Sequence, residues 1–187
     1  MDYTIRKATL EDRDVLEQLI AASARGLSIE DYSAPQIETA IATVFGVDTE
    51  LIVDGTYFVA ESSGRLVGCG GWSKRRTLFG GDRYSSRDSG ELEPQTEPAR
   101  IRAFFVHPEF SRKGIGRALL DRCEAEAVAH GFRALELMAT LPGVKLYKTC
   151  GYTGGSQVEL ELAGGVKLEL VPMKKVLVAL TGSKTGA

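Results

Sequence analysis

Two glycines and three basic residues between positions 112 and 117 give this sequence its clearest chemical capacity. The segment reads Arg112-Lys113-Gly114-Ile115-Gly116-Arg117 and follows an apolar run that ends at Val106. A long amphipathic pattern begins at the first glycine, so we expect a helix to start there. The first turn of a helix leaves backbone N–H groups unpaired, and the helix dipole adds positive charge. Because glycine lets an anion approach these donors, the segment predicts a phosphate or pyrophosphate site.

Other glycine-rich phosphate motifs do not fit this segment. A Walker loop needs the pattern Gly-x-x-x-x-Gly-Lys-Ser/Thr, which the chain lacks. A dinucleotide fingerprint needs a third glycine, whereas this position holds Leu119. Two glycines at a helix start can also serve packing alone, so the segment by itself leaves the identity of the ligand open.

The composition limits the classes of protein to consider. The chain of 187 residues has 23 basic and 25 acidic residues, a formal net charge of −2, and 43% hydrophobic residues. These values are typical of a soluble folded domain and exclude intrinsic disorder. They also argue against nucleic acid as a partner, because proteins that bind it carry a basic excess. No apolar run approaches the roughly 18 residues of a membrane span, so we expect no membrane partner.

The cysteines and histidines suggest neither a metal site nor a redox pair. Cys69, Cys123 and Cys150 are far apart and form no Cys-x-x-Cys motif. His107 and His130 form no His-Glu-x-x-His pattern, so no protein-bound metal is expected. Free thiols suit a reducing compartment, and the N-terminus has no apolar signal core. We therefore expect a cytoplasmic protein.

Hydrophobic periodicity predicts the elements that surround the glycine segment. In chain order they are a strand (3–8), a helix (9–26), a helix after Ser33, strands (56–62, 65–74, 101–106), a helix (114–130), a strand (135–139), a short helix (142–148) and two strands (156–162, 166–174). Residues 75–98 lack an apolar period and predict a long loop. This order indicates one mixed α/β domain over residues 1–180, followed by a flexible tail at 181–187.

A second motif, Leu146-Tyr147-Lys148-Thr149-Cys150-Gly151-Tyr152, follows later in the chain. The first motif, Val-x-Pro-x-Phe followed by Arg-Lys-Gly-Ile-Gly-Arg, resembles the acetyl-coenzyme-A motif of the GNAT superfamily of N-acetyltransferases. The second resembles that family's aromatic turn, which ends in Gly-Phe or Gly-Tyr. The resemblance implies a GNAT-like single α/β domain. Its twisted, mixed but mostly antiparallel sheet would have about six to seven strands, flanked by about four helices.

The resemblance also implies acetyl-coenzyme A as cosubstrate and assigns residues to it. The backbone of Phe104, Phe105 and Val106 would pair with the pantetheine arm like an added strand. The pyrophosphate would be held by backbone N–H groups of Arg112, Lys113, Gly114, Ile115, Gly116 and Arg117. Two positions depart from the family pattern. Ser111 replaces the usual Gln or Arg, and residues 140–142 lack the Asn with which many members contact the pantetheine arm.

The chemistry of acetyl transfer to an amine suggests roles for two further residues. An amine with a pKa near 10.4 must lose a proton at a cost of about 4.6 kcal/mol at pH 7, so a base or a water chain is needed. Some members of the family use a Glu in this strand as the base, so the resemblance makes Glu136 the candidate, with a solvated strand position as its alternative. The resemblance places Tyr147 near the sulfur, where a phenol can protonate the departing thiolate. An aromatic packing anchor is the alternative for Tyr147.

The sequence thus predicts an N-acetyltransferase that moves an acetyl group from acetyl-coenzyme A to a primary amine by direct transfer. A small-molecule acceptor is favoured, with a peptide amine as the alternative. The rival interpretation is a non-catalytic acyl-coenzyme-A-binding sensor or interaction module of the same fold. Trp72, Tyr32 and the acidic residues of 75–98 are candidates to border the acceptor pocket and favour a cationic amine. A homodimer is possible because two-fold dimers are common.

Overall fold

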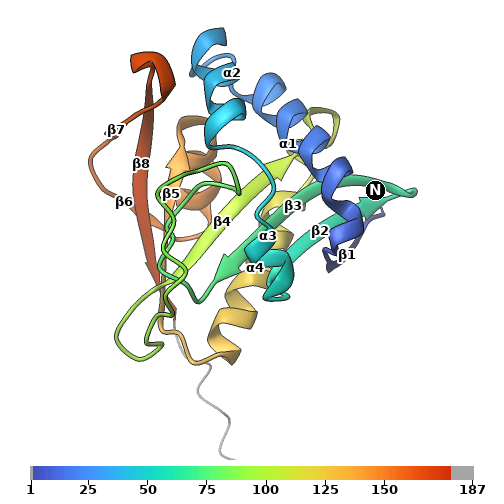
Figure 1. Cartoon of the computed structure of the whole chain (residues 1–187). Coiled ribbons are helices and arrows are strands. Elements are labelled where there is room, and N and C mark those ends of the chain that lie inside the picture. The colour runs from blue at the N-terminus through green and yellow to red at the C-terminus, as the bar shows by residue number, and fades with distance from the viewer. Residues whose placement is uncertain (1, 178–187) are drawn as a thin grey trace, which may run out of the picture.

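Two neighbouring central strands, β4 and β5, run parallel, whereas the other paired strands of the described residues are antiparallel. The computed structural model describes residues 2–177, in which an eight-stranded sheet has the order β1-β2-β3-β4-β5-β8-β6, with β7 paired to β8. Figure 1 shows this open, twisted sheet. The strands are β1 (Thr4–Lys7), β2 (Tyr57–Ser62), β3 (Arg65–Ser73), β4 (Ala99–Val106), β5 (Ala134–Thr140), β6 (Thr153–Gly154), β7 (Val158–Glu161) and β8 (Lys167–Val176).

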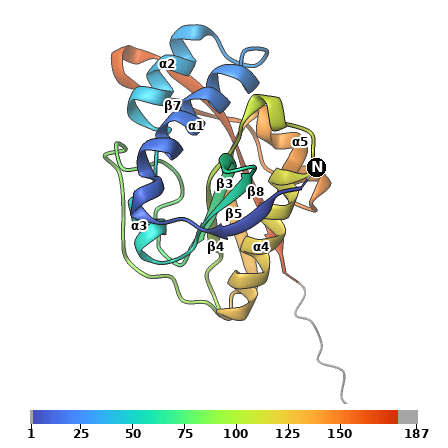
Figure 2. The same ribbon diagram turned by 90° about the vertical axis from the view of Figure 1, so that its right-hand side faces the viewer.

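Helices cover both faces of the sheet, as Figure 2 shows in a view close to its edge. One face carries α1 (Arg13–Leu27), α2 (Ala34–Thr43) and α3 (Thr49–Val53), and the other carries α4 (Ile115–Ala129) and α5 (Val144–Thr149). The α1 side and the α4 side therefore each have an apolar core. Strand β5 contributes to both, because successive side chains of a strand point to opposite faces. Its Leu135 and Leu137 pack on the α4 side, whereas Met138 packs on the α1 side.

The predicted order of elements is confirmed, and the structure adds two short elements, α3 and β6. The described residues hold eight strands and five α-helices, where the sequence predicted about six to seven and about four. Helix α3 spans one turn and is capped by Asp48, whose side chain accepts from Leu51 N at 3.4 Å. Such a short element has no periodicity to detect. The predicted tail at 181–187 lies outside the described residues.

Strands β4 and β5 pair only over a short distance and then separate. Their parallel register joins Ala99 to Leu135 and Arg100 to Glu136. Strand β5 pairs along its whole length with β8, from Ala134 to Thr140. The C-terminal half of β4 therefore has β3 on one side and no paired strand on the other.

A bulge in β4 changes which residues face each core. Ala103 has a φ of +56°, and the register with β3 shifts between Arg102 and Phe105. The Tyr57 hydroxyl donates to the carbonyl of Ala103 at 3.3 Å. As a result Ile101 and Phe104, three residues apart, both pack on the α4 side, whereas regular alternation would place them on opposite faces. Ala103 and Phe105 pack on the α1 side.

A buried ion cluster joins β4, α3 and the long loop. Arg102 and Asp48 form an ion pair, and their side chains are 1% and 0% exposed. Arg87 of the loop donates to Asp48 at 3.0 Å and to Glu50 at 3.2 Å. Burial raises the pKa of Asp48 and lowers the pKa of Arg102, so each charge depends on its partners.

The described residues hold no helix long and apolar enough to cross a membrane. The same part of the chain holds no group of three or more His, Cys, Asp or Glu side chains that could bind a metal. Its three cysteines, Cys69, Cys123 and Cys150, are free and buried.

We expect Asp48→Asn to lower the free energy of unfolding by about 3 kcal/mol. The substitution keeps the shape and capping capacity of the side chain but leaves the Arg102 guanidinium buried without its closest counter-charge. Urea denaturation measures the change. The control is Glu38→Gln, which breaks the exposed Arg25–Glu38 pair and should leave the midpoint almost unchanged. Equal effects of the two variants would show that the buried cluster does not stabilise the fold.

Candidate functional site

A cleft of about 700 Å³ lies where β4 and β5 separate. It extends from α1 and the turn after α1 to α5 and the start of α4. The predicted binding residues that line it are Phe104, Phe105, Val106, Arg112, Gly114, Ile115, Gly116 and Arg117, and Tyr147 lines it as well. The structure thus brings together two motifs that are well separated in the sequence.

The loop before α4 has the geometry of an anion site. Arg112 and Gly114 both have left-handed backbones, with φ values of +61° and +85°. No side chain of the described residues caps α4, so the N–H groups of its first turn are left for a ligand. A Cβ atom added at Gly114 would meet nothing within 4 Å, which leaves the approach to these donors open. The backbone donors and open space fit a pyrophosphate.

The basic side chains of this loop differ in their contacts. Arg112 and Arg117 are exposed and make no ion pair with another described residue. Lys113 does not line the cleft. Its ammonium donates to the carbonyl of Glu109 at 2.8 Å and lies 5.0 Å from the centre of the Phe110 ring. Within this loop, the two arginines are therefore the side chains available to add charge attraction for an anion.

The turn after α1 brings opposite charge to the same cleft. Glu30 and Asp31 line it, are exposed and have no ion-pair partner within residues 2–177. The cleft is thus basic at the start of α4 and acidic at the turn after α1. Neither acidic residue was singled out in the sequence, since isolated carboxylates in a turn carry no motif.

Tyr147 projects from α5 to the point where β4 and β5 separate. It is 7% exposed, and its ring centre lies 6.3 Å from that of Phe104 and 5.7 Å from that of Tyr152. Its hydroxyl makes no hydrogen bond with the described residues. Burial raises the pKa of Tyr147 well above the usual value for a tyrosine. The phenol therefore keeps its proton throughout the physiological pH range.

A second, smaller cavity of about 80 Å³ lies beside the cleft. Five residues line both spaces, namely Phe45, Phe104, Phe105, Thr140 and Tyr147. Phe45 and Phe105 belong to or pack against the α1-side core, and Phe104 and Tyr147 the α4-side core, so the shared wall combines both faces of the sheet. The separation of β4 and β5 is therefore the place where the two cavities meet.

Glu136, the candidate base, lies outside both cavities. Its carboxylate forms an ion pair with Arg100 of β4, and these two residues are also the last backbone pair that joins β4 to β5. It shares a strand face with Met138, which lines the small cavity two residues later. Its role as a base stays a prediction, and the Arg100 pair is a contact that the sequence did not reveal.

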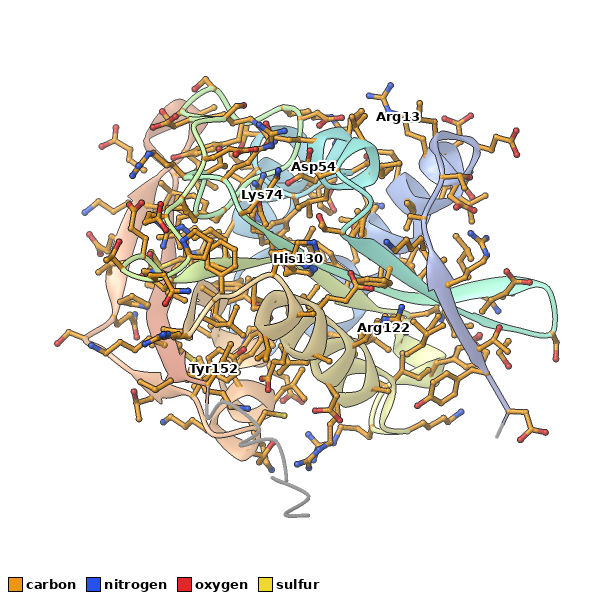
Figure 3. All side chains as sticks on the ribbon, turned by 90° about the horizontal axis from the view of Figure 1, so that it is seen from below. Arg13, Asp54, Lys74, Arg122, His130 and Tyr152 are labelled. Atoms are coloured by element: carbon orange, nitrogen blue, oxygen red, sulfur yellow. The ribbon has the colours of Figure 1, made fainter. Side chains whose placement is uncertain are left out.

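The residues predicted to border the acceptor pocket line neither cavity. Trp72 is fully buried on the α4 side, where its ring centre lies 4.9 Å from that of His130. Figure 3 shows His130 at the end of α4. None of the acidic residues of 75–98 lines either cavity, and Glu91 and Glu97 form ion pairs with Lys74 and Arg76. Figure 3 shows Lys74 close to Asp54. The same loop does reach the small cavity, through residues 79–81.

Tyr32 is a positioning residue beside the cleft and lines neither cavity. Its hydroxyl donates to the carbonyl of Glu169 at 2.5 Å and accepts from Leu141 N at 2.9 Å. Burial raises the pKa of Tyr32 to about 12. It thereby fixes the turn that follows Thr140, which includes the cleft residue Pro142.

Ser23 of α1 is a cleft residue that the sequence analysis did not identify. It is 5% exposed, and its hydroxyl accepts from Val106 N at 3.2 Å. This bond satisfies a backbone donor that has no strand partner in β5. A polar residue close to the apolar stripe formed by Leu16, Leu19 and Ile20 is the only sequence signal for it.

Comparison with known proteins identifies relatives of this arrangement. Residues 22–152 match the model of the acetyltransferase (GNAT) family. No curated protein matches the chain at the level of sequence.

Solved structures share the fold. A GCN5-related N-acetyltransferase from Rhodopseudomonas palustris has 20% identity and a TM-score of 0.71, with 95% of this chain and 97% of that chain covered. The PaiA N-acetyltransferase from Thermoplasma acidophilum, in complex with coenzyme A, has 18% identity, a TM-score of 0.63 and coverages of 94% and 99%. A ribosomal-protein-alanine N-acetyltransferase from Brucella melitensis has 21% identity, a TM-score of 0.58 and coverages of 93% and 99%. The predicted fold class is thereby confirmed.

We expect Gly114→Glu to weaken coenzyme A binding by about tenfold to a hundredfold. A carboxylate at this position would repel the pyrophosphate and block backbone donors, and a hydrogen bond to a charged group contributes about 1.5–3 kcal/mol. Calorimetric titration measures the affinity. Gly164→Glu is the matched control, because Gly164 also has a positive φ, +70°, and open space around its Cβ position, yet lies outside the cleft. The anion site is wrongly assigned if both variants bind coenzyme A like the unmodified chain.

Proposed function

Because the chain belongs to the GNAT acetyltransferase family, we propose that it transfers the acetyl group of acetyl-coenzyme A directly to a primary amine within a ternary complex. The observation that carries this proposal is the position of Tyr147 at the junction of two cavities. The larger cavity reaches the anion site at the start of α4, and the smaller one lies behind β4. Two cavities that meet at one phenol suit a reaction between two bound molecules.

The large cleft suits acetyl-coenzyme A as the cosubstrate, which supplies an acetyl group on a thioester. The backbone donors before α4 and the guanidinium groups of Arg112 and Arg117 would hold its pyrophosphate. The unpaired edge of β4, from Phe104 to Val106, would hold its amide-containing arm through backbone hydrogen bonds. Val106 N, which now donates to Ser23, is already engaged, so the other backbone groups of this edge would provide those bonds.

Tyr147 would protonate the sulfur when it departs. A thiol in water has a pKa of about 8.5, so its thiolate is a weak proton acceptor for a tyrosine whose pKa is raised. The low polarity that raises the pKa of Tyr147 also raises that of a thiol beside it. Both pKa values are thus raised, so the difference between them stays small enough for proton transfer from the phenol to the thiolate.

The acceptor amine would enter as a cation and lose its proton at the site. Glu30 and Asp31 at the cleft attract a cationic amine and lower the local concentration of anionic competitors. The proton would leave through water. Glu136 lines neither cavity, so it would act as the base only through intervening water.

We propose a small-molecule acceptor rather than a peptide amine, because the small cavity measures only about 80 Å³ and its wall includes residues 79–81 of the long loop. A cytoplasmic location accords with three free, buried thiols among the described residues. A homodimer stays a prediction.

The decisive experiment is a calorimetric titration with acetyl-coenzyme A, with ADP as the control ligand, followed by thiol release with a panel of amines. We expect binding that is tighter than that of ADP and thiol release that depends on the amine. Binding without release for every amine would instead favour a non-catalytic acyl-coenzyme-A sensor. Absence of binding would contradict the proposed function.

We expect Tyr147→Phe to lower kcat by about 10²- to 10⁴-fold, because proton transfer by a positioned group contributes about that much. Acetyl-coenzyme A affinity should change little, since the ring and its packing are kept. Tyr152→Phe is the matched control. Tyr152 packs against Tyr147 and also has a buried hydroxyl, but it lines neither cavity. Full turnover in Tyr147→Phe would exclude the acid role.

The pH dependence offers a second test of Tyr147. We expect kcat/KM to rise with pH and to show no decline up to pH 10, because an acceptor amine with a pKa near 10.4 is still losing its proton at that pH. The decline is absent because the raised pKa of Tyr147 keeps the phenol protonated where an ordinary tyrosine, of pKa about 10, would be half ionised. A stopped assay in overlapping buffers measures the profile. A decline centred near pH 10 would contradict the assignment.

A further inference from the structure

The small cavity beside Tyr147 has a predominantly apolar wall. Its sides come from the segment after α2, the long loop, and strands β4, β5 and β8. The aromatic and aliphatic residues that line it are Val44, Phe45, Phe79, Ile101, Ala103, Phe104, Phe105, Met138, Tyr147 and Leu170. Covering such a surface with another apolar group removes it from water and lowers the free energy.

We propose that this cavity receives an apolar group of the acceptor, of about three or four carbon atoms, and so selects aliphatic primary amines. This inference rests on the acetyl transfer proposed above. The cavity measures about 80 Å³. An engineered apolar cavity of about 150 Å³ binds benzene, so roughly half that volume suits a propyl or butyl group.

The charged groups near the cavity strengthen this choice. Among its lining residues in the described chain, only Arg102 is charged, and its side chain is 1% exposed. Its guanidinium pairs with Asp48 and Glu50 and donates to the carbonyl of Gly80 at 3.3 Å. Arg102 therefore offers little attraction to an acidic acceptor, and a hydroxyl or carboxylate in the cavity would lose hydration without adequate compensation.

The wall formed by the long loop is held in place by hydrogen bonds. The carbonyl of Gly80 also accepts from Arg87 at 2.9 Å, and Gly81 N donates to the carbonyl of Val44 at 2.8 Å. The ring of Phe79 packs against Tyr84 at 5.0 Å between ring centres. The size of the cavity is thus built into the fold, and size is the property that the acceptor must match.

The position of the cavity favours the acceptor over a longer acyl chain as its occupant. Tyr147, the proposed acid for the sulfur, belongs to the α4-side core, whereas Phe45 and Phe79 belong to or pack against the α1-side core. The sulfur is already bonded to the carbonyl carbon of the thioester, so the attacking amine must approach this carbon from a different direction. The sulfur would lie toward Tyr147, and the amine would approach from the α1 side, where its carbon chain can enter the cavity.

The test compares kcat/KM for n-alkylamines from methylamine to hexylamine, with acetyl-coenzyme A saturating and N-acetyl product quantified by mass. We expect kcat/KM to rise by about fourfold for each methylene up to propylamine or butylamine, since about 0.8 kcal/mol accompanies each buried methylene. It should then fall for longer chains. Ethanolamine, which replaces the last methyl group of propylamine by a hydroxyl, should be about tenfold poorer than propylamine.

Phe79→Ala provides the matching enlargement of the cavity. It should move the optimum to a longer amine and leave acetyl-coenzyme A affinity unchanged, because Phe79 does not line the large cleft. Ile41→Ala is the control, since Ile41 packs against the same apolar core but lines neither cavity. In that variant the optimum should stay at propylamine or butylamine.

Three results would overturn the inference. Efficient acetylation with no dependence on chain length would refute it and leave the proposed acetyl transfer intact. A dependence on the acyl chain of propionyl- or butyryl-coenzyme A that shifts in Phe79→Ala, with no dependence on the amine, would assign the cavity to the acyl group. Absence of acetyl-coenzyme A binding would reject both the proposed function and this inference.

Discussion

The short parallel pairing between β4 and β5 is the constraint on which the site depends. Only Ala99–Leu135 and Arg100–Glu136 join these strands, while β4 pairs further with β3 and β5 pairs along its length with β8. The sheet therefore consists of two half-sheets joined at one end. Each half keeps its own hydrogen-bond partners, so the strands can separate without breaking the rest of the sheet. The cleft and the small cavity both lie at this separation.

Separation of two strands exposes backbone groups that need other partners. Three buried hydroxyl groups meet part of this need, and they come from α1, the turn before α2 and β2. Ser23 accepts from Val106 N, Tyr32 accepts from Leu141 N, and Tyr57 donates to the carbonyl of Ala103. Buried backbone polar groups are costly when they lack partners, so these side chains stabilise the open arrangement. They lie around the site and leave its centre to Tyr147.

Local patterns in the sequence predicted most of the fold and the loop before α4 that we propose as the anion site. The loop before α4 could be identified because glycine positions and the start of a helix lie within a few consecutive residues. The small cavity could not, since Phe45, Phe79, Met138 and Leu170 come from four distant segments and carry no motif. The environment of Glu136 could not be predicted either, because its ion-pair partner Arg100 lies in another strand. The prediction that Trp72 borders the acceptor pocket was wrong for a related reason. Alternation along β3 does not reveal which face of the strand packs against which core.

The three buried thiols have a consequence for an enzyme that would release a free thiol at every turnover. Thiol–disulfide exchange requires a thiolate and access to it. Burial raises the pKa of Cys69 to about 12 and that of Cys123 well above its ordinary value, and Cys150 is 8% exposed. Oxidised product that accumulates under oxidative stress would find few reactive sulfur atoms on this part of the chain. The protein would therefore resist mixed-disulfide formation with its own by-product.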